Sequence, residues 1–122
     1  MKILYADGFN IGGNPSRVGG GYTITDEHGT VICQETIIKS GLTNNEGELL
    51  GVLAALEMAD YGAEVYTDSM NTIRWVKSAN PKARPDLREE CEQAHWLVEE
   101  KQIKLLFVPR DENLAGIENE KR

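Results

Sequence analysis

Three acidic residues stand where a carboxylate is costly, and they are the residues of this chain best suited to chemistry. Asp7 closes an apolar run at residues 3–6, Glu48 opens the helical run LLGVLAALEMA, and Asp68 ends a strand-like stretch at residues 63–67. A carboxylate at the edge of an apolar element loses hydration and requires a partner, and few cations lie nearby in the sequence. The pattern therefore indicates a site for divalent metal ions.

Each of these acids also has an ordinary structural explanation. Asp7 and Gly8 could form a turn, Asp68 could cap a helix that begins at Ser69, and Glu48 could interact with the positive end of its own helix. Together these explanations are weaker, because three independent coincidences would have to fall where one metal site requires its ligands. We therefore expect one shared site.

The elements that must position the acids follow from periodicity and turn signals. The sequence predicts an α/β chain with three strands, a helix, a fourth strand, two helices, a fifth strand and a short terminal helix. In chain order, we expect these elements at residues 2–8, 20–25, 30–39, 44–60, 63–67, 69–78, 85–101, 102–108 and within 111–122. Thr43 and Glu46 match a capping box, in which Thr43 accepts a backbone N–H and Glu46 reaches back to the cap residue.

This arrangement brings the acids together. Steps of four residues from Glu48 lead to Val52 and Leu56, the stripe that should press on the sheet, so Glu48 points at the sheet. If the fourth strand pairs in parallel with the first, Asp68 emerges beside Asp7. Two Mg²⁺ ions about 3.5–4 Å apart could then form a clamp for in-line phosphoryl displacement.

Length and composition bound these hypotheses. The 122 residues suffice for one domain, residues 1–122, and 40% apolar with 27% charged residues is ordinary for a globular protein. No apolar run approaches the roughly 20 residues that span a bilayer, and the first residues lack a signal-peptide pattern, so we expect a cytoplasmic protein away from membranes. Cys33 and Cys91 suggest neither a disulfide framework nor a metal knuckle.

The net charge of −7 argues on its face against a nucleic-acid partner. Its distribution weakens that objection, because residues 74–88 gather five basic residues against one acid. Bound metal would also offset part of the acidic total.

Four motifs carry a family resemblance that spans almost the whole chain. They are YADGF at 5–9, TNNEGELLGVLAALE at 43–57, YTDSMNTIRWV at 66–76 and VPRDEN at 108–113. In this order and spacing they resemble ribonuclease H of the type I class. The resemblance implies a five-stranded mixed sheet of order 3-2-1-4-5, with the first three strands antiparallel, flanked by helices.

The resemblance also implies a function. It predicts endonucleolytic cutting of the RNA strand in RNA–DNA hybrids, with two Mg²⁺ or Mn²⁺ ions held by Asp7, Glu48 and Asp68. Asn44 and Asn45 would lie along the minor groove of the hybrid, where 2′-hydroxyls can be read. Further candidate substrate contacts are Gly8, Thr43 and Arg110. We expect a monomer that needs no small-molecule organic cofactor.

The chain departs from the family pattern in its last segment. The family usually places a fourth carboxylate four residues after the asparagine that matches Asn113, and this chain has Ile117 there. Glu118, after a one-residue shift of the terminal helix, is the first candidate substitute, and Glu120 is the second. Without a substitute the second metal should bind weakly, and activity should survive better with Mn²⁺ than with Mg²⁺.

Other functions fit parts of the pattern. The fold also serves other metal-dependent nucleases, such as exonucleases and junction resolvases, although the asparagine pair before Glu48 suits a hybrid minor groove. A chain that lacks the fourth acid could instead be a catalytically weak or silent module that binds nucleic acid or protein.

Overall fold

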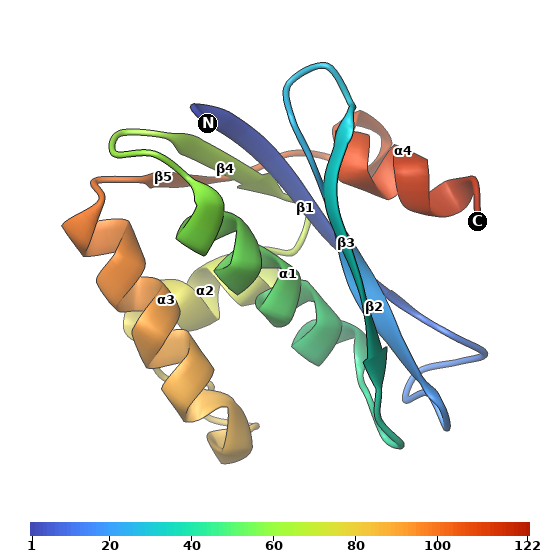
Figure 1. The fold of residues 1–122 in the computed structure, drawn as a ribbon. Coiled ribbons are helices and arrows are strands. Elements are labelled where there is room, and N and C mark those ends of the chain that lie inside the picture. Colours follow the sequence, from blue (N-terminus) through green and yellow to red (C-terminus); the bar gives the residue numbers. More distant parts are fainter.

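The computed structural model describes residues 1–122 as one five-stranded sheet with helices on both of its faces (Figure 1). The strands are β1 (Ile3–Asn10), β2 (Gly19–Thr25), β3 (Val31–Ile38), β4 (Glu64–Thr67) and β5 (Lys104–Phe107). The helices are α1 (Asn44–Met58), α2 (Met70–Ser78), α3 (Arg88–Glu100) and α4 (Leu114–Glu120). Short 3-10 turns at Pro85–Leu87 and Arg110–Glu112 precede α3 and α4.

The strand order is β3-β2-β1-β4-β5, as predicted. β1, β2 and β3 are antiparallel neighbours, whereas β4 pairs in parallel with both β1 and β5. Gly29 allows the tight β2–β3 turn because its φ of 80° is unfavourable for other residues. The parallel β1–β4 pair requires a crossover, and α1 lies within it. The predicted fold class is confirmed.

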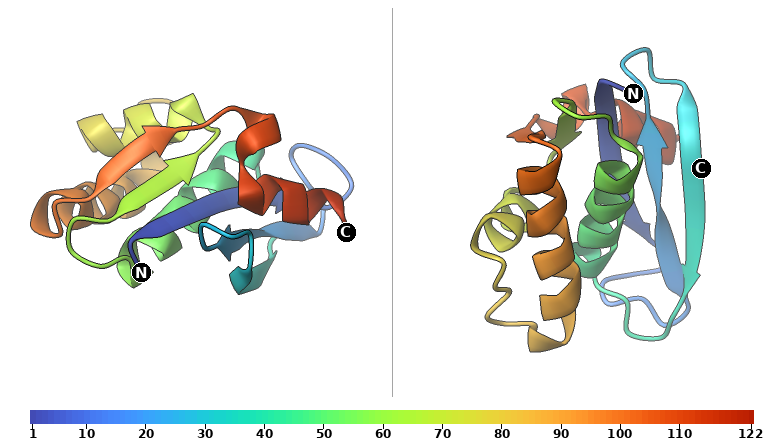
Figure 2. Two further views of the ribbon diagram at one scale, coloured as in Figure 1. Left: turned by 90° about the horizontal axis from the view of Figure 1, so that it is seen from above. Right: turned by 60° about the vertical axis from the view of Figure 1, so that its left-hand side comes forward.

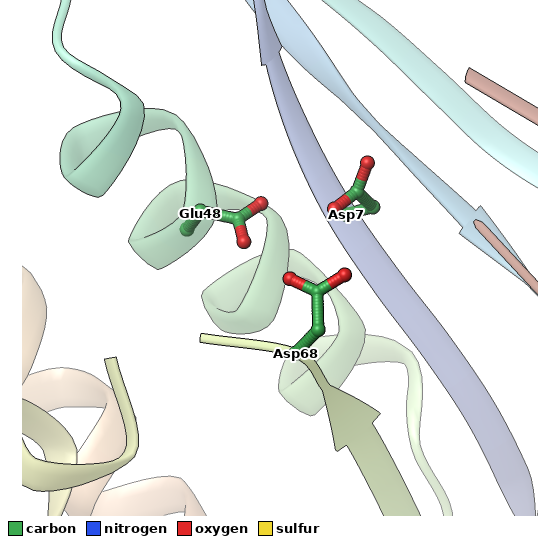
Figure 3. A group of neighbouring side chains, drawn as sticks. All are labelled: Asp7, Glu48 and Asp68. Atoms are coloured by element: carbon green, nitrogen blue, oxygen red, sulfur yellow. The ribbon is translucent and has the colours of Figure 1, made fainter. Parts of the chain in front are cut away.

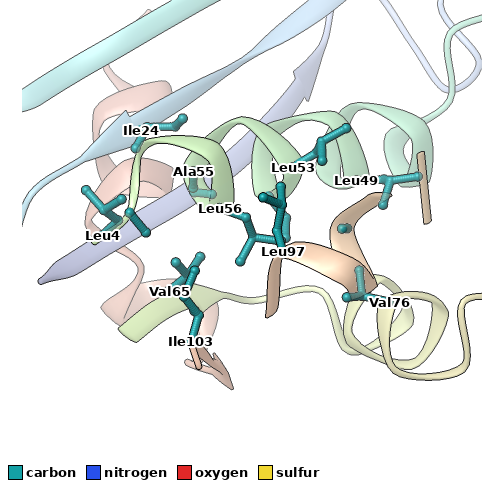
Figure 4. Packing of buried hydrophobic residues seen from close by; sticks show 14 of the residues in the cluster. Leu4, Ile24, Leu49, Leu53, Ala55, Leu56, Val65, Val76, Leu97 and Ile103 are labelled. Atoms are coloured by element: carbon teal, nitrogen blue, oxygen red, sulfur yellow. The ribbon is translucent and has the colours of Figure 1, made fainter. Parts of the chain in front are cut away.

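Helix α1 joins the sheet to the other helices through its apolar side. Val52 and Leu56 are fully buried, as their spacing predicts, and they belong to the same cluster as Leu4 of β1 and Leu97 of α3 (Figure 4). Burial of each such side chain stabilises the fold by about 1.5–3 kcal/mol. This packing fixes the rotation of α1, and therefore the direction in which Glu48 points.

The helices form two layers around the sheet (Figures 1 and 2). α1, α2 and α3 cover one face, whereas α4 packs on the opposite face against β1 and β2. β1 is therefore covered from both sides, by α1 and by α4.

None of the helices combines the length and apolar character that crossing a bilayer requires.

Two predicted boundaries differ from the structure, and the first of them affects the site. β1 was expected at residues 2–8 but continues to Asn10, because its pairing with β2 extends to the Asn10–Gly20 pair. Asp7 therefore lies inside a strand and not at its tip. The helix expected at 85–101 begins as a 3-10 turn at Pro85 and becomes α-helical at Arg88.

The capping box at the start of α1 is only half formed. Thr43 Oγ1 accepts the N–H of Glu46 at 3.2 Å, as predicted. The Glu46 side chain does not return to the cap but binds Lys39 at 2.5 Å and Arg84 at 3.0 Å. Glu46 is only 4% exposed, and in such surroundings charged partners bind a carboxylate more strongly than a backbone N–H does.

Candidate metal centre

The three acids singled out in the sequence meet beside the point where β1 and β4 stop pairing. The parallel register ends at the Tyr5–Tyr66 pair, two residues before Asp7 and Asp68. Glu48 approaches from α1, and the three carboxylates point toward one another (Figure 3). One oxygen from each residue lies within 4.8 Å of the other two.

Gly8 allows Glu48 to reach this position. Leu4 and Ala6 are buried, as expected for the face of β1 that α1 covers, so alternation puts Asp7 on the opposite face and Gly8 toward α1. A Cβ atom at Gly8 would lie 2.5 Å from the carbonyl carbon of Gly47, which is closer than real contacts allow. The Gly8 N–H donates a hydrogen bond to Glu48 Oε1. Glycine therefore permits the close crossing and supplies a donor to one acid.

Asp68 is free of the capping role that its position also suggested. Ser69 is the N-cap of α2, and its hydroxyl accepts the Thr72 N–H at 3.1 Å. Asp68 instead accepts a hydrogen bond of 3.1 Å from Asn113 Nδ2, which also donates to the carbonyl of Ala6 at 3.0 Å. Asn113 is fully buried, so this amide ties the start of α4 to both β1 and Asp68.

Asp7 is contacted by helix α4 on the other face of the sheet. Asn119 Nδ2 donates to Asp7 Oδ2 at 2.7 Å and to the Asp7 carbonyl at 3.2 Å. One helical turn earlier, a Cβ atom at Gly116 would lie 3.6 Å from the Asp7 carboxyl carbon. This is an ordinary contact distance, so α4 passes Asp7 closely enough for the Asn119 amide to reach the acid.

No lysine or arginine forms an ion pair with any of the three acids. Burial raises the pKa of Glu48 to about 9, and the nearby charge of Asp7 adds to the shift. Burial also raises the pKa of Asp7 to about 6, although the hydrogen bond from Asn119 opposes the shift. The metal-free site therefore has excess negative charge that a proton or a divalent cation can neutralise.

The acids open into a cleft of about 630 Å³, in which Phe9 is the one apolar lining residue. Several predicted contacts line it, namely Gly8, Asn44, Asn45, Arg110 and Glu120. Thr43 and Glu118 do not, since Thr43 receives hydrogen bonds from Glu46 and Arg84 and Glu118 pairs with Lys121 at 2.9 Å. Ile117, where the family usually has its fourth acid, is 37% exposed and also lies outside the cleft lining.

The basic segment at residues 74–88 is less available than its composition suggested. Arg84 binds Asp86 at 2.8 Å and the buried Glu46 at 3.0 Å, so its charge is already neutralised. Arg74, Lys77 and Lys82 line a separate shallow surface depression. Arg88 pairs with Glu92 at 3.5 Å, so these three residues are the part of the segment that is left to attract phosphates.

Sequence reasoning missed the two amides that hold the acids. Asn113 was visible as the last residue of the VPRDEN motif and as a match to a family asparagine, but its contact with Asp68 was not foreseen. Asn119 carried a weaker signal, since a position three residues after Gly116 lies on the same face of a helix. Neither contact can be read without knowing how α4 is rotated against β1.

The sheet order and the acidic cluster at the β1–β4 junction define a ribonuclease H-like class of protein. The family model described as RNase H matches residues 1–120. The chain belongs to the RNase H family. No curated protein matches it.

Solved structures give the same assignment. The chain is similar to LC11-RNase H1, isolated from compost and solved in complex with an RNA/DNA hybrid, with 27% identity, a TM-score of 0.65 and coverage of 91% of this chain and 87% of that one. It is 28% identical to the N-terminal RNase H domain of rv2228c from Mycobacterium tuberculosis, with a TM-score of 0.68 and coverage of 93% and 90%. It is 25% identical to RNase H1 from the halophilic archaeon Halobacterium salinarum NRC-1, with a TM-score of 0.68 and coverage of 93% of this chain and 89% of that one.

Proposed function

We propose that this protein is a divalent-metal-dependent endonuclease that hydrolyses the RNA strand of RNA–DNA hybrids. The observation that carries the proposal is the meeting of Asp7, Glu48 and Asp68, with oxygens within 4.8 Å of one another in a polar cleft. Membership of the RNase H family and the similarity to an RNase H1 solved with a hybrid support the choice of substrate.

The chemistry of the donors fits Mg²⁺ or Mn²⁺. All three side chains offer carboxylate oxygens, which hard cations prefer, and each is partly buried without a competing ion pair. When bound, two such ions would supply the charge that stabilises the attacking and leaving oxygens of an in-line displacement. The residues of the chain hold the ligand oxygens in place and exclude part of the surrounding water.

The cleft suits a polar, anionic polymer. Asn44 and Asn45 stand at the first turn of α1, beside Glu48, where their amides can hydrogen-bond 2′-hydroxyls in a minor groove. Arg110 lines the same cleft and is placed to contact a backbone phosphate. We assign substrate contact to these three residues and to the backbone of Gly8.

Glu120 is the stronger candidate for a fourth ligand. It lines the cleft and lies on α4, the helix that contacts Asp7, whereas Glu118 pairs with Lys121 outside the cleft. Glu120 is exposed, so its carboxylate is free to turn toward a bound ion. We therefore prefer Glu120 over Glu118, the reverse of the order expected from the sequence.

A cleavage assay tests the proposal. Labelled RNA–DNA hybrid, duplex DNA, duplex RNA and a branched junction are incubated with the protein in Mg²⁺, Mn²⁺ or EDTA, beside the Asp68→Asn variant. We expect internal cuts in the RNA strand of the hybrid only, lost in EDTA and in the variant. Cuts in the junction or in duplex DNA would instead indicate another nuclease with this fold. Absence of cutting in both metals would favour a silent binding module.

A further inference from the structure

A chain of hydrogen bonds runs from the sheet to Asp7 through two residues to which neither the motifs nor the acidic cluster assigns a role. Gln34 Nε2 on β3 donates to Thr23 Oγ1 on β2 at 2.8 Å. Thr23 Oγ1 donates to Asn119 Oδ1 on α4 at 2.6 Å, and Asn119 Nδ2 donates to Asp7 Oδ2 at 2.7 Å. This series of hydrogen bonds therefore passes from β3 through β2 to α4 before it reaches Asp7.

The hydrogen atoms that each group carries determine which group donates in each of these three hydrogen bonds. The Thr23 hydroxyl has one hydrogen and already receives a hydrogen bond from Gln34, so its own hydrogen goes to Asn119 Oδ1. The Asn119 amide must then present its NH₂ group to Asp7. The opposite orientation would place two acceptor oxygens 2.7 Å apart at the carboxylate. Thr23 is fully buried, so water does not compete for this role.

We propose that Asn119, oriented by Thr23, is a positioning residue that fixes the Asp7 carboxylate for metal binding. The inference rests on the proposed metal site. Asn119 restrains one Asp7 oxygen and the Asp7 carbonyl from the α4 side. The restraint limits rotation of the carboxylate, which keeps Asp7 within 4.8 Å of the ligand oxygens of Glu48 and Asp68. Asn119 is not itself a ligand, because its oxygen is engaged by Thr23 and its nitrogen carries the donor hydrogens.

The arrangement also explains how α4 serves a site from which the usual acid is missing. Asn119 stands one helical turn after Gly116, which faces Asp7, whereas Ile117 is exposed. The helix thus presents a neutral amide to Asp7. A neutral donor orders a carboxylate without neutralising it, so the charge remains available to a cation.

Three substitutions test the proposal, with Mg²⁺ and Mn²⁺ affinity measured by calorimetry and thermal unfolding measured in EDTA. Asn119→Ala removes the donor, and Thr23→Val removes the orienting hydroxyl while preserving volume. Thr25→Val is the matched control, because Thr25 is on the same strand, is equally buried, and has a hydroxyl without a hydrogen-bond partner.

We expect Asn119→Ala to weaken metal binding roughly 10- to 100-fold, the usual effect of removing a residue that orients a ligand. Thr23→Val should weaken it roughly 2- to 10-fold, as for one lost hydrogen bond. In the Asn119→Ala background, Thr23→Val should have no further effect, because Thr23 acts through the amide. Thr25→Val should bind metal like the parent.

Other results would overturn the assignment. If Asn119→Ala lowers the melting temperature in EDTA but binds metal like the parent, Asn119 only attaches α4 to the sheet. If the effects of Thr23→Val and Asn119→Ala multiply, the two residues act separately. A parent protein that binds Mg²⁺ through Asp7 but cuts no hybrid would refute the proposed nuclease, whereas these affinity measurements would still decide the role of Asn119.

Discussion

Metal binding should displace a proton from Glu48, and the number of protons can be worked out from the structure. The pKa of Glu48 is raised to about 9 and that of Asp7 to about 6 in the metal-free site. At pH 7, Glu48 is therefore about 99% protonated and Asp7 about 10% protonated. Because metal ligands must be ionised, filling the site at pH 7 should release about one proton.

The same values predict how affinity depends on pH. Metal affinity should rise by about tenfold per pH unit while Glu48 remains protonated, or about 100-fold between pH 6.5 and pH 8.5, and should level off above pH 9. The free energy of unfolding of the metal-free protein should fall as the pH rises. The contribution of Glu48 to this free energy is fully present below its ordinary pKa of 4.5 and is lost as the pH rises toward 9.

Calorimetric titration with Mg²⁺ or Mn²⁺ in two buffers of different ionisation enthalpy measures the protons released. Glu48→Gln should bind metal more weakly and should show less than about a twofold change in affinity between pH 6.5 and pH 8.5. Glu57→Gln is the charge-matched control, because Glu57 is exposed on the same helix. A parent protein that releases no proton and binds metal equally at both pH values would refute this account of the site.

Three further predictions concern single residues. Asp68→Asn should abolish hybrid cleavage while leaving the melting temperature in EDTA equal or higher, because it removes a negative charge that repels the nearby carboxylate of Asp7. Gly8→Ala should lower the free energy of unfolding, measured in urea, by roughly 1–3 kcal/mol. It should also reduce metal affinity, since the added Cβ would lie 2.5 Å from Gly47 and push α1 away from β1. Glu120→Gln should raise the Mg²⁺ concentration needed for half-maximal cleavage, whereas Glu118→Gln should leave it unchanged; the reverse result would restore Glu118 as the first candidate.

The sheet order and the acidic cluster were predictable because their signals are local. The four-residue steps from Glu48 oriented α1, and the parallel crossover brought Asp68 alongside Asp7. Each step needed only the period of one element or the handedness of one connection. The placement of the acids was also insensitive to the misjudged end of β1, because the face on which a residue lies does not depend on where its strand stops.

The contacts that depend on packing between distant segments were not predictable. The bond from Asn119 to Asp7 joins residues 112 positions apart and depends on the rotation of α4 about its own axis, which a helix of seven residues hardly specifies in sequence. Glu46 similarly matched a capping box, yet the cations Lys39 and Arg84 were more strongly attractive partners. That competition also removed Arg84 from the basic surface expected to attract phosphates.

The structure suggests a common rule for how the three acids are held. Each receives a hydrogen bond from a neutral donor: Asp7 from Asn119, Glu48 from the Gly8 N–H, and Asp68 from Asn113. A lysine or arginine in any of these places would stabilise the carboxylate more strongly, but it would also compete with a metal ion for the same oxygens and repel that ion. Neutral donors fix geometry and leave the charge unpaired. Without metal, the ionised carboxylates are therefore destabilised by burial and by one another, as their raised pKa values show. Binding of divalent cations should relieve this destabilisation.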